Sequence, residues 1–157
     1  MVWLNLAFNR LSGPLPTTIG QMSSLSWLYL QQNSLGGPLP TQIGQLTKLS
    51  WLNIYQNYGL QGTLPSEVGT MTALQWFDVR YNQINGTIPS TIGTMSALTA
   101  LLLVGNSLSG TVPSELGAIT SLSSYCWLDT NSLTGSLPTS ERGGSAPAPP
   151  PPLLSFS

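Results

Sequence analysis

The chain has 157 residues, of which only 6% are charged, and it contains no histidine and a single cysteine. Four Lys and Arg residues against five Asp and Glu residues leave no basic stripe that could neutralise phosphates, so nucleic acid is not expected as a partner. Without histidine the chain lacks the commonest general base and metal ligand, and one cysteine cannot form an intramolecular disulfide. Composition therefore predicts a protein that is not an enzyme and holds neither a cofactor nor a metal.

One unit recurs along most of the chain, and its clearest copy runs from Leu25 to Leu49. In every copy a proline follows an asparagine by seven or eight residues, and in five copies a glycine stands four residues after that proline. Self-similarity at a fixed period of 20–50 residues is typical of a solenoid, in which each unit buries its apolar face only by stacking on its neighbours. The asparagines are spaced 24 or 25 residues apart and define an asparagine ladder: Asn9, Asn33, Asn57, Asn82, Asn106 and Asn131.

Each position of the unit has a physical reason. In Leu28-Tyr29-Leu30 apolar residues alternate with a residue that points the other way, which predicts a short half-buried strand. The asparagine side chain can satisfy backbone groups left unpaired where the chain turns off that strand. A glycine then permits a tight bend, and the proline suits the first position of a short helical turn.

In chain order, the first copy spans Met1–Gly20 and enters its strand without the opening leucine of the unit, which suggests a fragment of a longer chain. The sixth copy stops after Pro138. We expect a repeat domain over residues 1–139, with its first and last copies incomplete, and a disordered proline-rich tail over residues 140–157. Neither a membrane span nor a signal peptide is recognisable. Complete copies begin at Leu25, Leu49, Leu74 and Leu98.

The residues that alternate with the inward leucines point onto the exposed, concave face of the predicted sheet. All five tryptophans of the chain take such positions. Aromatic rings rimmed by polar groups suit the binding of a partner, although stacked rings could equally serve only to stabilise the sheet. In the fifth copy Leu102 is expected to add an exposed apolar patch. The predicted ligand-binding residues are Trp3, Trp27, Tyr29, Trp51, Asn53, Tyr55, Trp76, Asp78, Arg80, Leu102, Tyr125, Trp127 and Asp129.

Three other features of the sequence bear on chemistry. Asp78 and Asp129 lie two predicted strands apart, about 10 Å on strand spacing alone, with no nucleophile or base beside them, so we expect solvated charges. Cys126 takes an inward strand position and is expected to be a small buried apolar side chain. Asn85, in Asn-Gly-Thr, is a predicted glycosylation acceptor on the turn side of the unit.

The unit NxLSGxLPxxIGxLxxLxxLxL, with the copies SGTVPSELG and NGTIPSTIG, resembles the plant-type leucine-rich repeat over about residues 2–138. That family includes receptor-like kinase and receptor-like protein ectodomains, polygalacturonase-inhibiting proteins, and algal and protist proteins. The resemblance implies a right-handed α/β-type solenoid with a parallel sheet on the concave face, short 3-10 turns on the convex side and a second short strand near G-x-[LIV]-P. It also implies an extracellular or cell-surface setting, although the paired-cysteine caps usual in secreted members are absent.

We therefore predict a non-catalytic recognition module that binds a protein or peptide, as part of a receptor-like ectodomain. One alternative is an inhibitor of a secreted polysaccharide hydrolase. Another is a structural protein of the cell wall or surface, with polysaccharide as its partner. More remotely, the hydroxyl residues Thr63, Thr87, Thr111 and Ser136 resemble the arrays of ice-binding repeat proteins, although prolines take this position in the first two copies.

Overall fold

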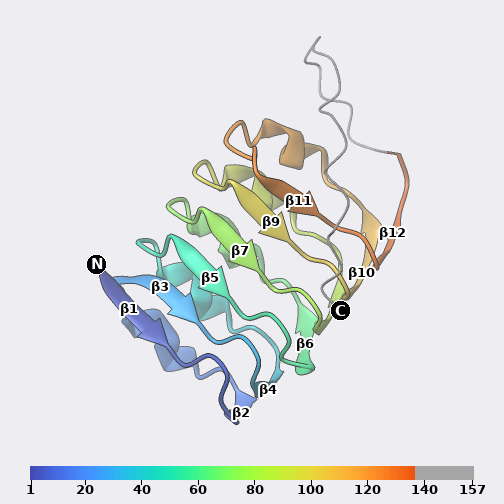
Figure 1. Ribbon diagram of the computed structural model, residues 1–157. Coiled ribbons are helices and arrows are strands. Elements are labelled where there is room, and N and C mark those ends of the chain that lie inside the picture. Colours follow the sequence, from blue (N-terminus) through green and yellow to red (C-terminus); the bar gives the residue numbers. More distant parts are fainter. Residues whose placement is uncertain (137–157) are drawn as a thin grey trace, which may run out of the picture.

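The computed structural model describes residues 1–136. The predicted tail over residues 140–157 and the end of the predicted repeat domain lie outside this range. Within it, successive coils stack side by side in chain order and form a curved solenoid (Figure 1). The predicted leucine-rich repeat architecture, with parallel strands on one side and short 3-10 turns on the other, is confirmed.

The first sheet takes one short strand from each coil, and all of its pairings are parallel. Its strands follow one another in chain order, and each is joined to the next by a crossover that passes through the second sheet and a 3-10 turn. Each coil can thereby bury its apolar residues against the next coil. The six strands, in sheet order, are β1 (Val2–Asn5), β3 (Leu25–Tyr29), β5 (Trp51–Asn53), β7 (Trp76–Asp78), β9 (Ala100–Leu102) and β11 (Tyr125–Trp127).

The second sheet confirms the short strand that the resemblance implied. Each of its strands ends near a glycine in the left-handed region, such as Gly86 at φ 72°, a conformation that other residues adopt only with strain. Its strands are β2 (Ser12–Pro14), β4 (Ser34–Gly37), β6 (Gly59–Thr63), β8 (Gln83–Gly86), β10 (Ser107–Thr111) and β12 (Ser132–Thr134).

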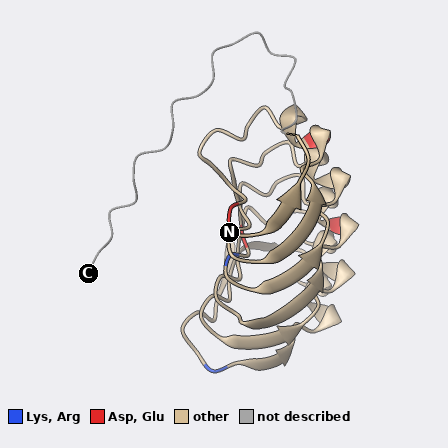
Figure 2. Cartoon of the chain, turned by 90° about the vertical axis from the view of Figure 1, so that its right-hand side faces the viewer, with Lys and Arg blue, Asp and Glu red and all other residues tan. Residues whose placement is uncertain are grey.

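Five 3-10 turns close the coils on the convex side, where they line the right-hand edge of Figure 2. Each turn begins directly after a proline with φ between −64° and −69°, which the pyrrolidine ring sets in advance. Charged residues are few and scattered over the fold (Figure 2). The turns are η1 (Thr17–Gln21), η2 (Thr41–Gln45), η3 (Ser66–Thr70), η4 (Ser90–Thr94) and η5 (Ser114–Ala118).

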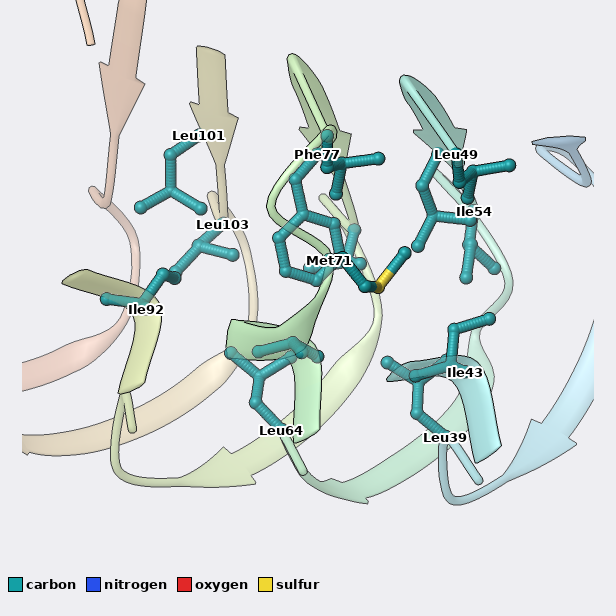
Figure 3. Packing of buried hydrophobic residues seen from close by; sticks show 14 of the residues in the cluster. Leu39, Ile43, Leu49, Ile54, Leu64, Met71, Phe77, Ile92, Leu101 and Leu103 are labelled. Carbon is teal, nitrogen blue, oxygen red and sulfur yellow. The ribbon is translucent and has the colours of Figure 1, made fainter. Parts of the chain in front are cut away.

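A single apolar core runs through the coils between the first sheet and the turns. Phe77 of β7 and Met71, which follows η3, are both fully buried and point into the same interior (Figure 3). Leu4 and Leu6 of the first coil are only partly buried. The core therefore has the linear form expected of a solenoid rather than that of a sphere.

The asparagine ladder is confirmed. Asn57 is fully buried, and its side-chain amide donates to the carbonyl oxygen of Leu30 in the preceding coil (2.9 Å) and to that of Ile54 in its own coil (3.1 Å). Its Oδ1 accepts the backbone N–H of Leu35 in the preceding coil at 3.1 Å. The ladder asparagines after Asn9 each tie their own turn in this way to the coil before it.

The one-residue insertion at Tyr58-Gly59 changes this pattern locally. Asn33 Oδ1 accepts the N–H of Leu11, two residues beyond the ladder asparagine of the preceding coil, at 3.0 Å. After the insertion, Asn82 Oδ1 instead accepts the N–H of Asn57 itself at 2.9 Å. The ladder thereby absorbs the extra residue without losing a hydrogen bond.

The prediction that Cys126 is buried is wrong, since this residue is exposed. Within residues 1–136, β11 is the last strand of its sheet, so a coil packs against Cys126 on one side only. The partial desolvation that remains raises the pKa of the Cys126 thiol. A raised pKa lowers the thiolate fraction, which makes this cysteine a poor nucleophile.

Candidate functional site

The first sheet places its aromatic residues in register on the concave face. Trp3 pairs with Trp27, Trp27 with Trp51, and Trp51 with Trp76 in successive parallel strands. Ala100 follows Trp76 in this row, and Tyr125 follows Ala100. Because neighbouring strands lie about 4.8 Å apart, side chains in one row must touch or lean over one another.

The rings form a continuous aromatic ridge, which we define as Trp3, Trp27, Tyr29, Trp51, Trp76, Tyr125 and Trp127. The ring centroids of Trp51 and Trp76 lie 4.4 Å apart with planes inclined by 5°, and those of Trp3 and Trp27 lie 5.0 Å apart. Tyr29 links the two stacks, with its centroid 6.5 Å from those of both Trp27 and Trp51. The ridge therefore runs the length of the first sheet.

At the fifth coil Ala100 interrupts the row of aromatic residues, and the rings on either side of it approach each other above it. The centroids of Trp76 and Tyr125 lie 5.9 Å apart, although Ala100 stands between them in the sheet. Ala100 is fully buried, and Leu102 has only 1% of its surface exposed. The predicted exposed apolar patch at Leu102 is therefore wrong, because neighbouring side chains lean across the narrow strand spacing and cover it.

Asp78 and Arg80 form a clamp at the centre of the concave face. The side chain of Asp78 is 1% exposed, and its Oδ1 and Oδ2 accept hydrogen bonds from Arg80 Nε (2.9 Å) and Nη2 (2.7 Å). The hydrogen bond to Asp78 raises the pKa of the Arg80 guanidinium. Asp78 is thus a buried ion-pair partner, and the expectation of a solvated charge at this position is wrong.

The Arg80 guanidinium carbon also lies 5.1 Å from the ring centroid of Tyr55 and 5.5 Å from that of Trp127. Trp127 stands two strands away from Arg80, so the guanidinium bridges the strand that carries Leu102. Cations over aromatic rings gain about 0.5–1 kcal/mol at exposed sites and more where desolvated. Burial is the main cause that raises the pKa of the Tyr55 phenol, with Arg80 opposing it.

The polar row of the concave face is partly structural. Asn53 Oδ1 accepts the backbone N–H of Tyr55 at 3.1 Å, and Asp78 Oδ1 accepts that of Arg80 at the same distance. Such contacts two residues apart stabilise the turn that ends the strand. Asp129, by contrast, is exposed.

Tyr81 is not among the predicted site residues, yet its ring centroid lies 5.7 Å from that of Tyr55. Tyr81 packs over Gly105 of the next coil, where an added Cβ would lie 2.6 Å from the Tyr81 ring. The sequence contains a sign of this contact. Gly105 stands directly before a ladder asparagine, where every other copy carries a larger residue, and the missing side chain leaves room for the Tyr81 ring.

No helix among residues 1–136 is long and apolar enough to cross a membrane. The same residues contain no group of three or more His, Cys, Asp or Glu that could hold a metal ion. The concave face thus offers aromatic surface and one ion pair as its principal functional groups.

Comparison with known proteins agrees with this geometry. The family model for the Leucine Rich Repeat matches residues 1–22, 24–46 and 73–95. A chain from the BIR3–SERK2 complex of Arabidopsis thaliana is 33% identical in sequence, with a TM-score of 0.72, and the match covers 84% of this chain and 69% of that one. This chain belongs to the plant-type leucine-rich repeat family.

This leucine-rich repeat protein is also similar to parts of larger proteins of known structure. The plant peptide hormone receptor RGFR1, solved in complex with RGF2, is 41% identical with a TM-score of 0.77 over 81% of this chain and 20% of the receptor. A plant ice-binding protein is 28% identical with a TM-score of 0.76 over 83% of this chain and 42% of its own. The chain spans only 16–23% of the first four matching receptor chains. No curated protein sequence matches it.

Proposed function

We propose that this leucine-rich repeat protein binds an extended peptide or protein segment along its concave face, as part of a receptor-like ectodomain outside the cell. The observation that carries the proposal is the continuous aromatic ridge. Trp3 is 64% exposed and Tyr125 is 42% exposed, while the rings between them are half-buried. Aromatic side chains of this kind dominate protein interfaces, since they bury a large area and lose little conformational entropy.

The relatives support this proposal. RGFR1 was solved with RGF2, and the Arabidopsis receptor kinase HAESA, which is 36% identical, was solved with the peptide hormone IDA and the co-receptor SERK1. Both are plant receptors of the same repeat family. An extended peptide is also the natural complement of a long, shallow ridge, because its side chains can contact successive coils.

The geometry is less favourable to the two alternatives. An inhibitor that covers a charged enzyme surface would need charged groups on the concave face, but Asp78 is buried and paired with Arg80. A glycan-binding face would need open ring faces, whereas Trp51 and Trp76 stack face to face and cover each other. A peptide can instead use the ring edges and the notches between rings.

The proposal is tested by selecting binders from a displayed library of random linear peptides against the full chain. The selected peptide is then titrated by calorimetry into the parent, Trp27→Ala, Trp127→Ala and a convex-side control, Thr41→Ala. Loss of a ridge tryptophan should weaken binding about 30-fold or more, the effect of a hot spot worth about 2 kcal/mol. Failure to select any saturable binder, or equal loss in Thr41→Ala, would reject a concave binding face.

A second candidate function rests on the hydroxyl row beside the second sheet. Thr63, Thr87 and Thr111 are all exposed. Their methyl carbons pack against the glycine of the next coil, where an added Cβ would lie 2.7–2.9 Å away. The three side chains are thereby held in one orientation and repeat at about the strand spacing.

A regular, uncharged row of hydroxyl and methyl groups suits an ordered water surface, and one structural relative is an ice-binding protein. The full chain is assayed for inhibition of ice recrystallisation, together with Thr87→Tyr and a convex control, Thr41→Tyr. Activity that only Thr87→Tyr removes would support this function. An inactive parent would eliminate it.

A further inference from the structure

The aromatic ridge is an unbroken path of oxidisable rings. From Trp3 to Trp127, each ring centroid lies 4.4–6.5 Å from the next one along the ridge. Indole and phenol groups give up an electron more readily than most side chains, and the electronic coupling between two rings falls steeply with their separation. The path joins β1 to β11, the outer strands of the first sheet within residues 1–136, over about 24 Å or five strand spacings (Figure 1). An electron can therefore cross the sheet in short steps from ring to ring.

The N-terminal end of the ridge is open to oxidants in solution. Trp3 is 64% exposed, whereas the other four tryptophans of the ridge are half-buried. Trp3 also stacks on Trp27, with the two ring planes inclined by 24°. An oxidant that removes one electron from the ridge therefore meets Trp3 first, and the vacancy that it leaves can be filled from Trp27.

The middle of the ridge can pass an electron vacancy along but is a poor place to retain one. Trp51 Nε1 and Trp76 Nε1 are buried, and neither donates a hydrogen bond to a group within residues 1–136. An oxidised indole becomes neutral only when its Nε1 proton leaves, and these two protons have no acceptor in that part of the chain. The ring would instead carry a positive charge in surroundings partly shielded from water, which is unfavourable. The vacancy thus moves on, and the nearly parallel stack of these two rings at 4.4 Å favours the transfer.

The phenol best placed to receive the vacancy is Tyr125. Its ring centroid lies 5.9 Å from that of Trp76 and 5.1 Å from that of Trp127, and the residue is 42% exposed. When an electron leaves Tyr125, the phenol proton can pass to water, which leaves a neutral tyrosyl radical. That radical is more stable than an oxidised tryptophan that keeps its proton. Tyr29, the other phenol of the ridge, is half-buried and so releases its proton to water less easily.

We propose that the aromatic ridge conducts one-electron oxidation from Trp3 to Tyr125, which makes Tyr125 the site where oxidative modification of the ridge collects. A one-electron oxidant, such as a small inorganic radical, first takes one electron from Trp3. One electron then moves ring by ring from Tyr125 to Trp3, and the phenol proton passes to water. Trp3 is restored, and the net loss is one electron and one proton from Tyr125. This activity needs no peptide ligand and goes beyond the proposed recognition function.

The test is pulse radiolysis of the full chain with azide radicals, which oxidise indole faster than phenol. Tryptophanyl and tyrosyl radicals are followed separately by their absorption bands. We expect the tryptophanyl band to decay as the tyrosyl band grows, in a first-order step whose rate does not depend on protein concentration. Tyr125→Phe should abolish this growth. Tyr58→Phe, which removes a more exposed phenol outside the ridge (60% exposed), should leave it unchanged.

Substitutions within the ridge test the path itself. Phenylalanine keeps an aromatic ring in the row but resists oxidation, so Trp51→Phe and Trp27→Phe should both slow the growth of the tyrosyl band. Trp127→Phe is the matched control, because Trp127 lies beyond Tyr125 as seen from Trp3. Circular dichroism and urea unfolding show whether each variant keeps the parent fold. Two path variants at different strands keep the test decisive if one of them is unstable.

Three results would overturn the proposal. The first is a tyrosyl band that still grows in Tyr125→Phe, or that grows as fast in both path variants as in the parent. The second is a rate that rises in proportion to protein concentration, because the electron would then move between molecules. The third is a tyrosyl band that appears only in Cys126→Ser, since the exposed Cys126 thiol would then be the end of the path. Trapping the radical with a nitroso spin trap, followed by mass spectrometry, should place the adduct on Tyr125.

Discussion

Replacing Asn57 by alanine tests whether the asparagine ladder holds the coils together. The substitution removes the only side-chain acceptor for the buried N–H of Leu35, and it takes one donor from each of the carbonyl groups of Leu30 and Ile54. An unsatisfied buried donor costs about 1–3 kcal/mol, and each lost hydrogen bond to a carbonyl about 0.5–1 kcal/mol. The carbonyl groups of Leu30 and Ile54 keep a second donor from Asn33 and Asn82. We therefore expect a loss of about 2–5 kcal/mol in the free energy of unfolding.

Asn9 provides the matched control. It is exposed and donates only to carbonyl groups of its own coil, those of Leu6 and Ala7. Asn9→Ala should therefore cost less than about 1 kcal/mol. Both variants are compared with the parent by urea unfolding, followed by circular dichroism and tryptophan fluorescence.

A third variant, Asn57→Asp, keeps an acceptor for Leu35 but places a second oxygen against two carbonyl groups. We expect it to be at least as unstable as Asn57→Ala, since it adds a buried, unpaired charge. If Asn57→Ala unfolds at the same urea concentration as Asn9→Ala, the ladder does not carry the stability assigned to it here.

Three further predictions follow from other parts of the structure. Gly105→Ala, at φ 67° and with its added Cβ 2.6 Å from a tyrosine ring, should lose about 1–3 kcal/mol of unfolding free energy, whereas Gly117→Ala, with nothing within 4 Å, should be nearly neutral by urea unfolding. The chain expressed through a secretory pathway should carry an N-glycan on exposed Asn85, and Thr87→Ala should abolish the mass shift seen on deglycosylation. The folded pKa of Tyr55 lies above its unfolded value, so burial of the neutral phenol contributes fully to the free energy of unfolding below about pH 10, and this contribution is lost as pH rises through the folded pKa. Tyr55→Phe, which cannot ionise, should remove that part of the alkaline loss of stability.

Repetition made the fold predictable. The fixed distances from asparagine to proline and from proline to glycine repeat the same local choices in every coil, and the structure confirms the strands, the ladder and the 3-10 turns. The tryptophan row was predictable for the same reason, because alternation along a strand decides which side chains share a face. The use of this face for binding remains a prediction.

Exposure was not predictable from alternation. Leu102 and Asp78 lie on the predicted face yet are almost completely buried, while Cys126 lies on the inward side yet is exposed. The periodicity of one strand determines the direction in which each side chain leaves the backbone. Only the tertiary structure decides what covers that side chain, because large rings and a guanidinium from strands two coils apart lean together across a spacing of about 4.8 Å.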